Sequence, residues 1–205
     1  DGSEAVLRMI LSDFFASSTD NDIFIADLNE IGKSEKRNFN QISESGGNDN
    51  QPKYSPDGKY IAFTSMERAG FEADKSRLMI FDKETGEIRN LTDNYDISVG
   101  QYIWSPNSET IYFTAANEIN TSIYKIDIES EELEVVQENR ANSDITLSPD
   151  GEKLYFKQQR STQPYEIFSK NVYGTGLKQL THLNKELLSS IEMNELESFW
   201  SFGAD

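Results

Sequence analysis

The sequence predicts an all-β fold of repeated four-stranded antiparallel units, because one turn motif and one order of strands recur along it. A complete unit lies between residues 51 and 92. Its turn, Ser55-Pro56-Asp57-Gly58, has a proline that fixes φ at the second position and a glycine that accepts unusual backbone angles. Short runs rich in β-forming residues follow at 59–64, 77–82 and 87–92. We therefore expect a tight hairpin and four short strands in this unit.

Ser105-Pro106-Asn107-Ser108 and Ser148-Pro149-Asp150-Gly151 occupy the same place in their units, and each begins 50 or 43 residues after the preceding turn. An aromatic strand follows each copy, at 110–114 and 153–157. The third strand of the unit recurs at 123–127 and again at 166–170. A period of roughly 40 to 50 residues with four strands per unit is typical of a β-propeller blade.

Three complete blades and a partial one are expected from this period. The expected divisions are a partial blade at 1–45, blades at 46–98, 99–140 and 141–181, and an exit segment at 182–205. The expected strands of the partial blade lie at 5–9, 22–27 and 39–43, with a charged excursion at 30–37.

The two ends of the chain depart from the repeat. Asp1-Gly2 looks like the second half of another Ser-Pro-Asp-Gly turn, and an arc of blades leaves an open edge on each side. We therefore expect a piece of a longer protein. Within 182–205 a further strand leading out of the repeats is favoured over a short helix.

The composition excludes several classes of function. The formal charge is −17 and the pI is about 4.4, so the protein should repel nucleic acids and anionic membranes. The acidic surface serves either solubility or the attraction of a cationic ligand. Cysteine is absent, which excludes disulfides, thiolate zinc sites and a cysteine nucleophile. No apolar run is long enough to span a bilayer.

No catalytic motif is present in the sequence. It contains no Gly-x-Ser-x-Gly elbow, no phosphate-binding glycine loop and no His-Glu-x-x-His zinc motif. The only histidine, His182, follows a predicted strand end and is expected to be a surface or capping residue. We therefore expect no catalytic residue, no metal site and no cofactor in this chain.

The candidate binding site is a long insertion at 65–76, where a tight hairpin would suffice to connect two strands. Its carboxylates could hold an ammonium group, its arginine could meet a carbonyl or carboxylate, and its phenylalanine could form an apolar wall. The candidate residues are Glu67, Arg68, Phe71, Glu72 and Asp74. In the alternative interpretation Glu67, Asp74, Arg68 and Arg77 pair among themselves at the surface, each pair contributing about 0 to 1 kcal/mol.

Three segments resemble the propeller domain of the prolyl oligopeptidase family, in its branch of bacterial dipeptidyl aminopeptidases and acylaminoacyl peptidases. They are the strand pair at 55–63, the loop at 67–77 with its core Arg-Ala-Gly-Phe-Glu-Ala-Asp, and the run at 179–184 that leads out of the last blade. The Ser-Pro-Asp-Gly repeats alone are shared with non-enzymatic propellers of the TolB type. The loop core and the run at 179–184 are more distinctive.

This resemblance implies a seven-bladed parent whose N-terminal propeller leads, beyond a stretch like 195–205, into an α/β-hydrolase domain of the same chain. Nothing in this sequence matches that domain or its catalytic triad. In the family the propeller gates the active site, and in dipeptidyl-peptidase branches acidic residues capture the free amino terminus of the peptide substrate.

Other interpretations of the resemblance stay open at this point. An acylaminoacyl peptidase acts on a blocked terminus that carries no charge, so capture by carboxylates would fail there. A TolB-like propeller would only bind proteins or peptides. The family also suggests a periplasmic or secreted protein, with the cytoplasm as the alternative.

Overall fold

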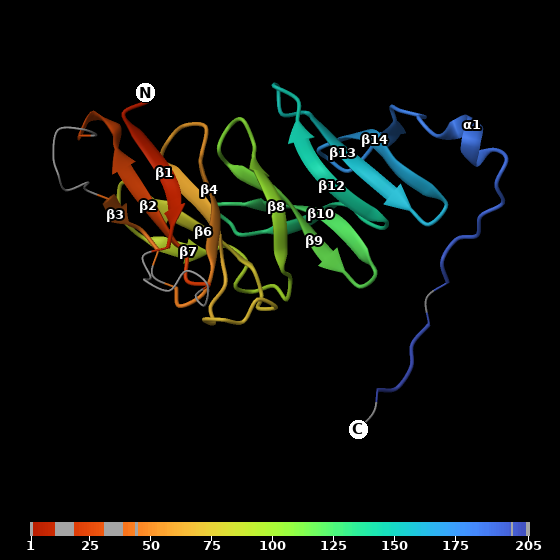
Figure 1. Ribbon diagram of the computed structural model, residues 1–205. Helices are drawn as coiled ribbons and strands as arrows, with labels where there is room; N and C mark the ends of the chain where they lie inside the picture. Colours follow the sequence, from red (N-terminus) through yellow and green to blue (C-terminus); the bar gives the residue numbers. More distant parts are fainter. Residues whose placement is uncertain (1, 11–18, 31–38, 44, 198, 204–205) are drawn as a thin grey trace.

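The computed structural model describes residues 2–10, 19–30, 39–43, 45–197 and 199–203 (Figure 1). In these segments almost all regular structure is β-strand, and paired strands are antiparallel apart from two single-residue parallel contacts. The exceptions are a 3₁₀ turn, η1 (Leu28–Glu30), and a short helix, α1 (Lys185–Leu188). The prediction of a nearly all-β fold with antiparallel sheets is confirmed.

The described strands form three sheets. The first contains β1 (Glu4–Met9), β2 (Asp22–Asp27) and β3 (Phe39–Gln41) in that order. The second contains β4 (Asp49–Tyr54), β5 (Tyr60–Ser65), β6 (Arg77–Asp82) and β7 (Ile88–Asn90). The third begins with β8 (Val99–Trp104), β9 (Thr110–Asn117), β10 (Asn120–Asp127) and β11 (Leu133–Gln137). It continues with β12 (Ala141–Leu147), β13 (Lys153–Arg160), β14 (Gln163–Asn171) and β15 (Lys178–Gln179).

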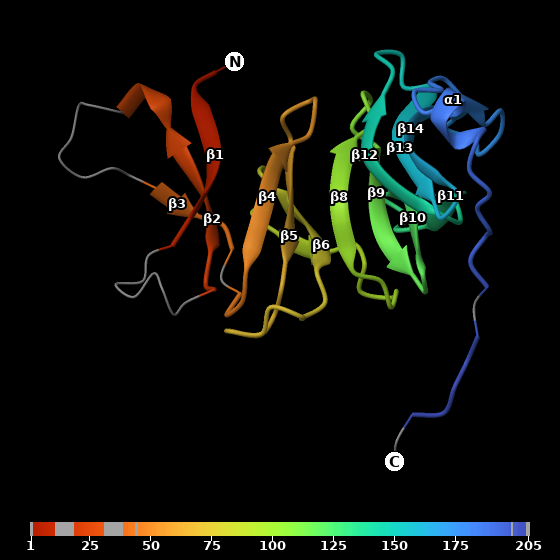
Figure 2. The same ribbon diagram turned by 45° about the vertical axis from the view of Figure 1, so that its right-hand side comes forward.

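The third sheet consists of two antiparallel groups of four strands, β8–β11 and β12–β15. They join where Thr121 at the start of β10 pairs in parallel with Ala141 at the start of β12. The sheets stand side by side in chain order, and β1, β4, β8 and β12 follow one another across the molecule (Figure 2). The molecule is therefore an arc of short meandering sheets.

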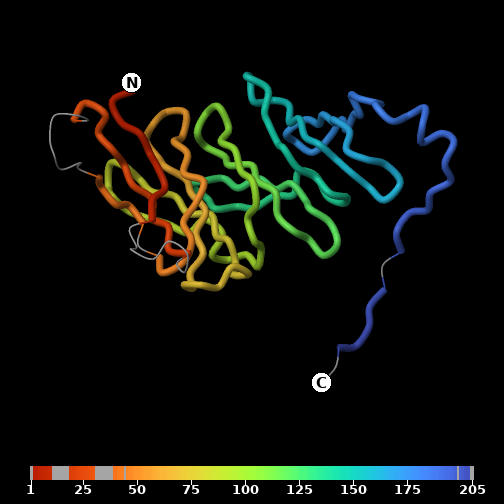
Figure 3. Tube along the Cα trace, in the orientation of Figure 1, coloured from red at the N-terminus to blue at the C-terminus, as the bar shows by residue number. Residues whose placement is uncertain are grey.

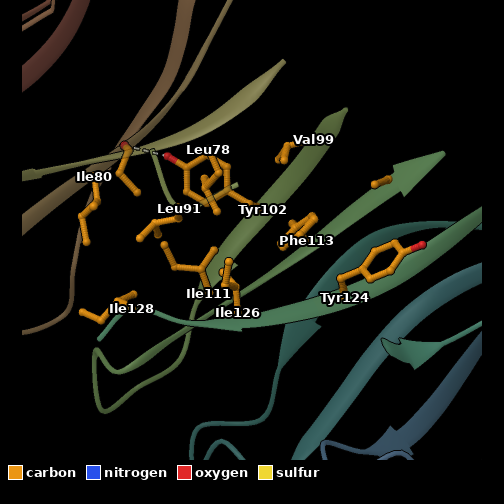
Figure 4. Close-up of a cluster of buried hydrophobic side chains, with 12 residues drawn as sticks. Leu78, Ile80, Leu91, Val99, Tyr102, Ile111, Phe113, Tyr124, Ile126 and Ile128 are labelled. Atoms are coloured by element: carbon orange, nitrogen blue, oxygen red, sulfur yellow. Dashed lines mark hydrogen bonds between the residues drawn. The ribbon is translucent and has the colours of Figure 1, made fainter. Parts of the chain in front are cut away.

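The hydrophobic cores lie between neighbouring sheets. The largest joins β4–β7 to β8–β11 and includes Leu78, Ile80, Leu91, Tyr102, Ile111, Phe113 and Ile126 (Figure 4). A second core joins β8–β11 to β12–β15 and includes Tyr112, Ile123, Val136, Leu154 and Phe156. A third joins β1–β3 to β4–β7 and includes Ile23, Ile42, Ile61 and Phe63.

Strand β5 shows why apolar residues occupy consecutive positions in the middle strands. Side chains alternate between the two faces of a strand, so Ile61 and Phe63 pack into one core while Ala62 packs into the next. All three are buried. Fully burying a large apolar side chain contributes about 1.5–3 kcal/mol, so a strand that fills two cores at once holds its neighbours together.

The three recurring turns share one hydrogen-bond pattern. The Oγ of Ser55 donates to the Oδ1 of Asp57 over 2.6 Å and accepts from the backbone N–H of Tyr60 over 2.9 Å. The equivalent sets are Ser105 with Asn107 and Thr110, and Ser148 with Asp150 and Lys153. The serine thus closes the turn from inside. This repetition supports the sequence interpretation of the motif as the start of the second strand in each unit.

One expectation needs correction. No strand forms in the described part of 182–205, where α1 is followed by an extended segment that runs away from the sheets (Figure 3). No described strand pairs with this segment, and a strand requires a partner for its backbone groups. The charged excursion at 30–37 lies almost entirely outside the described residues.

Candidate functional site

The connection between β5 and β6 lines a cavity of about 310 Å³ at one end of the sheets. Thr19 and Asn21, just before β2 of the neighbouring sheet, form one part of the wall. Asn48, just before β4, forms another part. The lining residues are Thr19, Asn21, Asn48, Met66, Arg68, Phe71 and Glu72. The insertion predicted from the sequence is therefore part of a hollow between two sheets.

Asp74 holds this connection in place through hydrogen bonds. Only 8% of the residue is exposed, and its Oδ2 accepts the backbone N–H groups of Glu67 over 3.1 Å and Arg68 over 2.8 Å. Its Oδ1 accepts from the Arg68 guanidinium, over 3.2 Å from Nε and 2.8 Å from Nη2, and from the backbone N–H of Lys75 over 3.0 Å. The Arg68 guanidinium, followed by these backbone groups, holds the pKa of Asp74 far below its usual value. Asp74 is therefore an ionised structural anchor.

Arg68 is held in place and still faces the cavity. Its guanidinium lies over the ring of Phe71, 4.2 Å from the ring centroid, while Asp74 takes two of its nitrogens. The side chain is 64% exposed. The backbone N–H of Gly70 donates to Thr19 Oγ1 over 2.8 Å, which ties the tip of the connection to the neighbouring sheet. The cavity wall is therefore fixed before any ligand arrives.

Glu72 supplies the unused charge of the site. It lines the cavity, is exposed, and makes no ion pair or hydrogen bond with any other residue that the structure describes. Glu67 lies outside the lining and pairs with Arg77 over 3.3 Å. The carboxylate of Glu72 is thus the acidic group available to a ligand in the cavity.

The five candidate residues therefore separate into different roles in the structure. Arg68, Phe71 and Glu72 share the cavity, whereas Asp74 supports it and Glu67 pairs beside it. The pairs of the alternative interpretation, Arg68 with Asp74 and Glu67 with Arg77, both form. The role of the five residues in binding stays a prediction.

Sequence reasoning missed the residues that come from elsewhere in the chain. Asn21 and Asn48 lie beside each other, and the Nδ2 of Asn21 donates to the Oδ1 of Asn48 over 2.9 Å. They are 27 positions apart in the sequence. Asn21 directly precedes β2 and Asn48 directly precedes β4, and these two strands belong to different sheets. A local pattern could not have joined them, because only the packing of the two sheets brings them together.

Other chemistry is sparse in the described part of the chain. It contains no group of three or more histidine, aspartate or glutamate side chains placed to hold a metal ion. His182 is exposed. None of the helices in the described segments has the length and apolar character needed to cross a membrane.

Comparison with curated proteins finds peptidases. Dipeptidyl-peptidase 5 of Porphyromonas gingivalis is 29% identical over 187 residues, which cover 91% of this chain and 26% of the relative. Dipeptidyl-peptidase 5 of Porphyromonas endodontalis is 27% identical over 186 residues, with the same coverage of 91% and 26%. The chain thus spans about a quarter of the length of these relatives. No family model matches the chain.

Comparison with solved structures finds β-propellers. An acylaminoacyl peptidase of Pyrococcus horikoshii aligns with a TM-score of 0.68 and 18% identity over 93% of this chain and 28% of its own. The β-propeller domain of the trilobed protease of Pyrococcus furiosus aligns at 0.58 and 20% identity, covering 88% and 50%. TolB of Acinetobacter baumannii aligns at 0.63 and 22% identity, covering 88% and 42%. These likenesses establish the fold.

The relatives and the structural neighbours confirm the predicted resemblance: the chain is similar to the β-propeller portion of serine peptidases of the prolyl oligopeptidase family, in the branch of the dipeptidyl and acylaminoacyl peptidases.

Proposed function

We propose that this chain is the non-catalytic propeller part of a serine exopeptidase. In this proposal the parent is a seven-bladed propeller protein with an α/β-hydrolase domain, and the propeller gates access to its active site. The cavity lined by the connection between β5 and β6 binds the free amino terminus of the peptide. The names of the relatives, dipeptidyl-peptidase 5, support a peptide substrate and a catalytic domain elsewhere in the parent.

The observation that carries the proposal is the unpaired carboxylate of Glu72 in a preformed cavity. An ammonium group forms charge-assisted hydrogen bonds to such a carboxylate, and these are stronger than hydrogen bonds between neutral groups. The positive charge of Arg68 is offset by Asp74, so it does not oppose a cation at Glu72. Arg68 can then donate to a carbonyl of the peptide, and Phe71 can contact its side chain.

Fixing the amino terminus would also determine which bond is cut. If Glu72 holds the ammonium group, the carbonyl that reaches the nucleophile lies at a set distance along the peptide. This relation explains how a non-catalytic domain imposes removal of dipeptides from one end of a chain.

The experiment compares two fluorogenic dipeptide substrates, one with a free and one with an acetylated amino terminus, in the parent protein. Glu72→Gln removes the charge at constant size, and Glu87→Gln in the exposed turn before β7 is the matched control. We expect cleavage of the free substrate only, with kcat/KM reduced about tenfold or more in Glu72→Gln, because a hydrogen bond to a charged group contributes about 1.5–3 kcal/mol. Glu87→Gln should behave like the wild type.

A preference for the acetylated substrate would overturn capture of an ammonium group and favour the acylaminoacyl interpretation. The likeness to TolB supports a second candidate, a propeller that only binds proteins or peptides. The gene discriminates between the two candidates: a Gly-x-Ser-x-Gly elbow encoded downstream of Asp205 supports the peptidase, and its absence supports the binding module.

A further inference from the structure

A second cavity, of about 450 Å³, lies at the same end of the strands as the first. It is built around the hairpin between β13 and β14, with walls from the hairpin between β9 and β10 and from the start of β12. Its lining residues are Ile119, Asn120, Arg140, Ala141, Gln159, Arg160, Ser161, Glu195 and Leu196.

The two cavities have equivalent positions in the repeat. Each is lined by the connection between the second and third strands of one unit, β5–β6 or β13–β14, and by residues at the start of a strand in the preceding unit, Thr19 and Asn21 beside β2 or Asn120 of β10. Each also includes the residue just before the first strand of its unit, Asn48 before β4 and Arg140 before β12. A parallel contact between the units marks both places, Asn21 with Asn48 and Thr121 with Ala141. The second cavity is therefore a repeat-related counterpart of the first.

The charges of the two cavities differ. The first contains the unpaired carboxylate of Glu72, whereas the second contains the guanidinium groups of Arg140 and Arg160. Arg140 makes no ion pair within the described residues, and its Nη1 lies 3.4 Å from the Oε1 of Gln158. The Nε of Arg160 is buried and has no hydrogen-bond partner in the part of the chain described. In a chain of charge −17, this cavity concentrates positive charge.

Only one carboxylate of the described residues lines this cavity, and it comes from the segment after α1. Glu195 lies 3.8 Å from Nη1 of Arg160, and its side chain is 66% exposed. Ser161 and Thr162 donate to it over 3.4 Å and 3.3 Å. A well-formed guanidinium–carboxylate pair has N···O distances of about 2.7–2.9 Å, so Glu195 fills this place only loosely.

We propose that the second cavity is a carboxylate-binding subsite for acidic peptides, with Arg140 and Arg160 as its ligands and Glu195 as a displaceable internal occupant. Arginine suits this role because its planar guanidinium can bind a carboxylate through two parallel hydrogen bonds. Since Glu195 is tethered to the same chain, its high local concentration competes with any external carboxylate. Removing the charge of Glu195 should therefore expose the subsite.

The experiment is a calorimetric titration of the intact protein with acetyl-Ala-Glu-Ala-amide at low ionic strength, with acetyl-Ala-Gln-Ala-amide as the uncharged comparison. We expect Glu195→Gln to lower the Kd for the Glu peptide about fivefold or more, because the tethered competitor is gone. Arg160→Gln and Arg140→Gln, each in the Glu195→Gln background, should weaken binding about tenfold or more. The Gln peptide should bind weakly to all variants.

The matched control is Arg8→Gln on β1, which changes the net charge equally at an exposed position. Thermal melting checks that each variant is folded, and having two arginine variants keeps the test decisive if one does not fold. Equal binding of the two peptides, or no gain of affinity in Glu195→Gln, would overturn the proposal. The peptides carry no free ammonium group and hydrolysis is not measured, so the result is independent of Glu72 and of the proposed peptidase function.

Discussion

Asp74 shows how one residue can be acidic and still not be a ligand. The sequence places three carboxylates in the connection between β5 and β6, and their chemistry is the same on paper. Only the folded geometry directs Asp74 inward to two backbone N–H groups and the Arg68 guanidinium, while Glu72 is left facing the cavity. The partner of a carboxylate depends on the path of the loop, which a sequence pattern does not contain.

Replacing Asp74 should loosen the connection without unfolding the sheets. Asp74→Asn keeps the size but replaces one acceptor oxygen with an NH₂ group and removes the charge that orients Arg68. We expect the backbone amides of Glu67 and Arg68 to exchange hydrogen about tenfold faster, because their acceptor is weakened. Exchange measured by mass spectrometry or NMR checks this, with the amides of β9 as the internal control. Unchanged exchange at Glu67 and Arg68 would contradict the anchoring role.

Tyr102 is the residue that joins two sheets through a buried polar group. It is fully buried, and its hydroxyl contacts two carbonyl oxygens, that of Ala62 on β5 over 2.8 Å and that of Gln51 on β4. Burial raises the pKa of Tyr102 above its usual value, so the hydroxyl remains a donor at all ordinary pH values.

Tyr102→Phe should destabilise the protein by about 1–3 kcal/mol, since it leaves a buried carbonyl without its partner. Urea denaturation measures this difference in the free energy of unfolding. Tyr173→Phe is the control, because Tyr173 is 81% exposed, and it should change stability by less than about 0.5 kcal/mol. Equal effects of the two substitutions would show that the hydroxyl of Tyr102 contributes nothing across the sheets.

The recurring turns allow the same substitution to be compared in two copies of one element. Gly58 and Gly151 have φ angles of +74° and +75°, so alanine is strained equally in both. A Cβ on Gly58 would have no neighbour within 4 Å, whereas one on Gly151 would lie 3.1 Å from Cδ of Pro106 in the preceding turn.

We expect Gly58→Ala to lower the free energy of unfolding by about 1–2 kcal/mol, the cost of the left-handed conformation for a residue with a Cβ. Gly151→Ala should cost more, because the ring of Pro106 must move as well. Chemical denaturation of both variants gives the comparison. A larger loss for Gly58→Ala would show that contact between neighbouring turns does not affect the free energy of unfolding.

These elements also show what could be predicted from the sequence. Strands after each turn were predictable, because a proline and a serine that closes the turn act within six residues in all three copies. The helix at 185–188 was missed although Lys, Glu and Leu all favour helices, because a run of four residues is too short for propensity to decide its structure. The walls of both cavities that come from neighbouring units were also beyond a local pattern, since Asn48 and Arg140 meet their partners only after the sheets pack.

At the scale of the whole molecule, two electrostatic effects of opposite sign act on stability. The net charge of −17 at pH 7 makes the folded chain repel itself, and this repulsion weakens as the pH falls toward the pI near 4.4. Turn aspartates act the other way. Hydrogen bonds hold the pKa values of Asp57, Asp82, Asp127 and Asp150 below their usual range, led respectively by the Ser55 hydroxyl, the Thr85 backbone, the Ser130 backbone and the Ser148 hydroxyl.

A group whose pKa is lowered by folding stabilises the protein above its unfolded pKa, and this contribution is lost as the pH falls through the folded value. We therefore expect Tm to rise from pH 8 toward pH 5, where repulsion declines, and to fall below about pH 4. There the turn aspartates and Asp74 take up protons in the unfolded chain, while their lowered pKa values keep them ionised in the folded protein. Calorimetry between pH 3 and 8 at constant ionic strength measures both the rise and the fall in Tm.

Added salt should flatten the rise in Tm between pH 8 and pH 5, because it screens the repulsion. The short hydrogen bonds in the turns are screened much less, so the fall in Tm below about pH 4 should persist. A Tm that declines steadily from pH 8 to pH 5 would show that local ion pairs such as Lys125 with Glu134 outweigh the net charge.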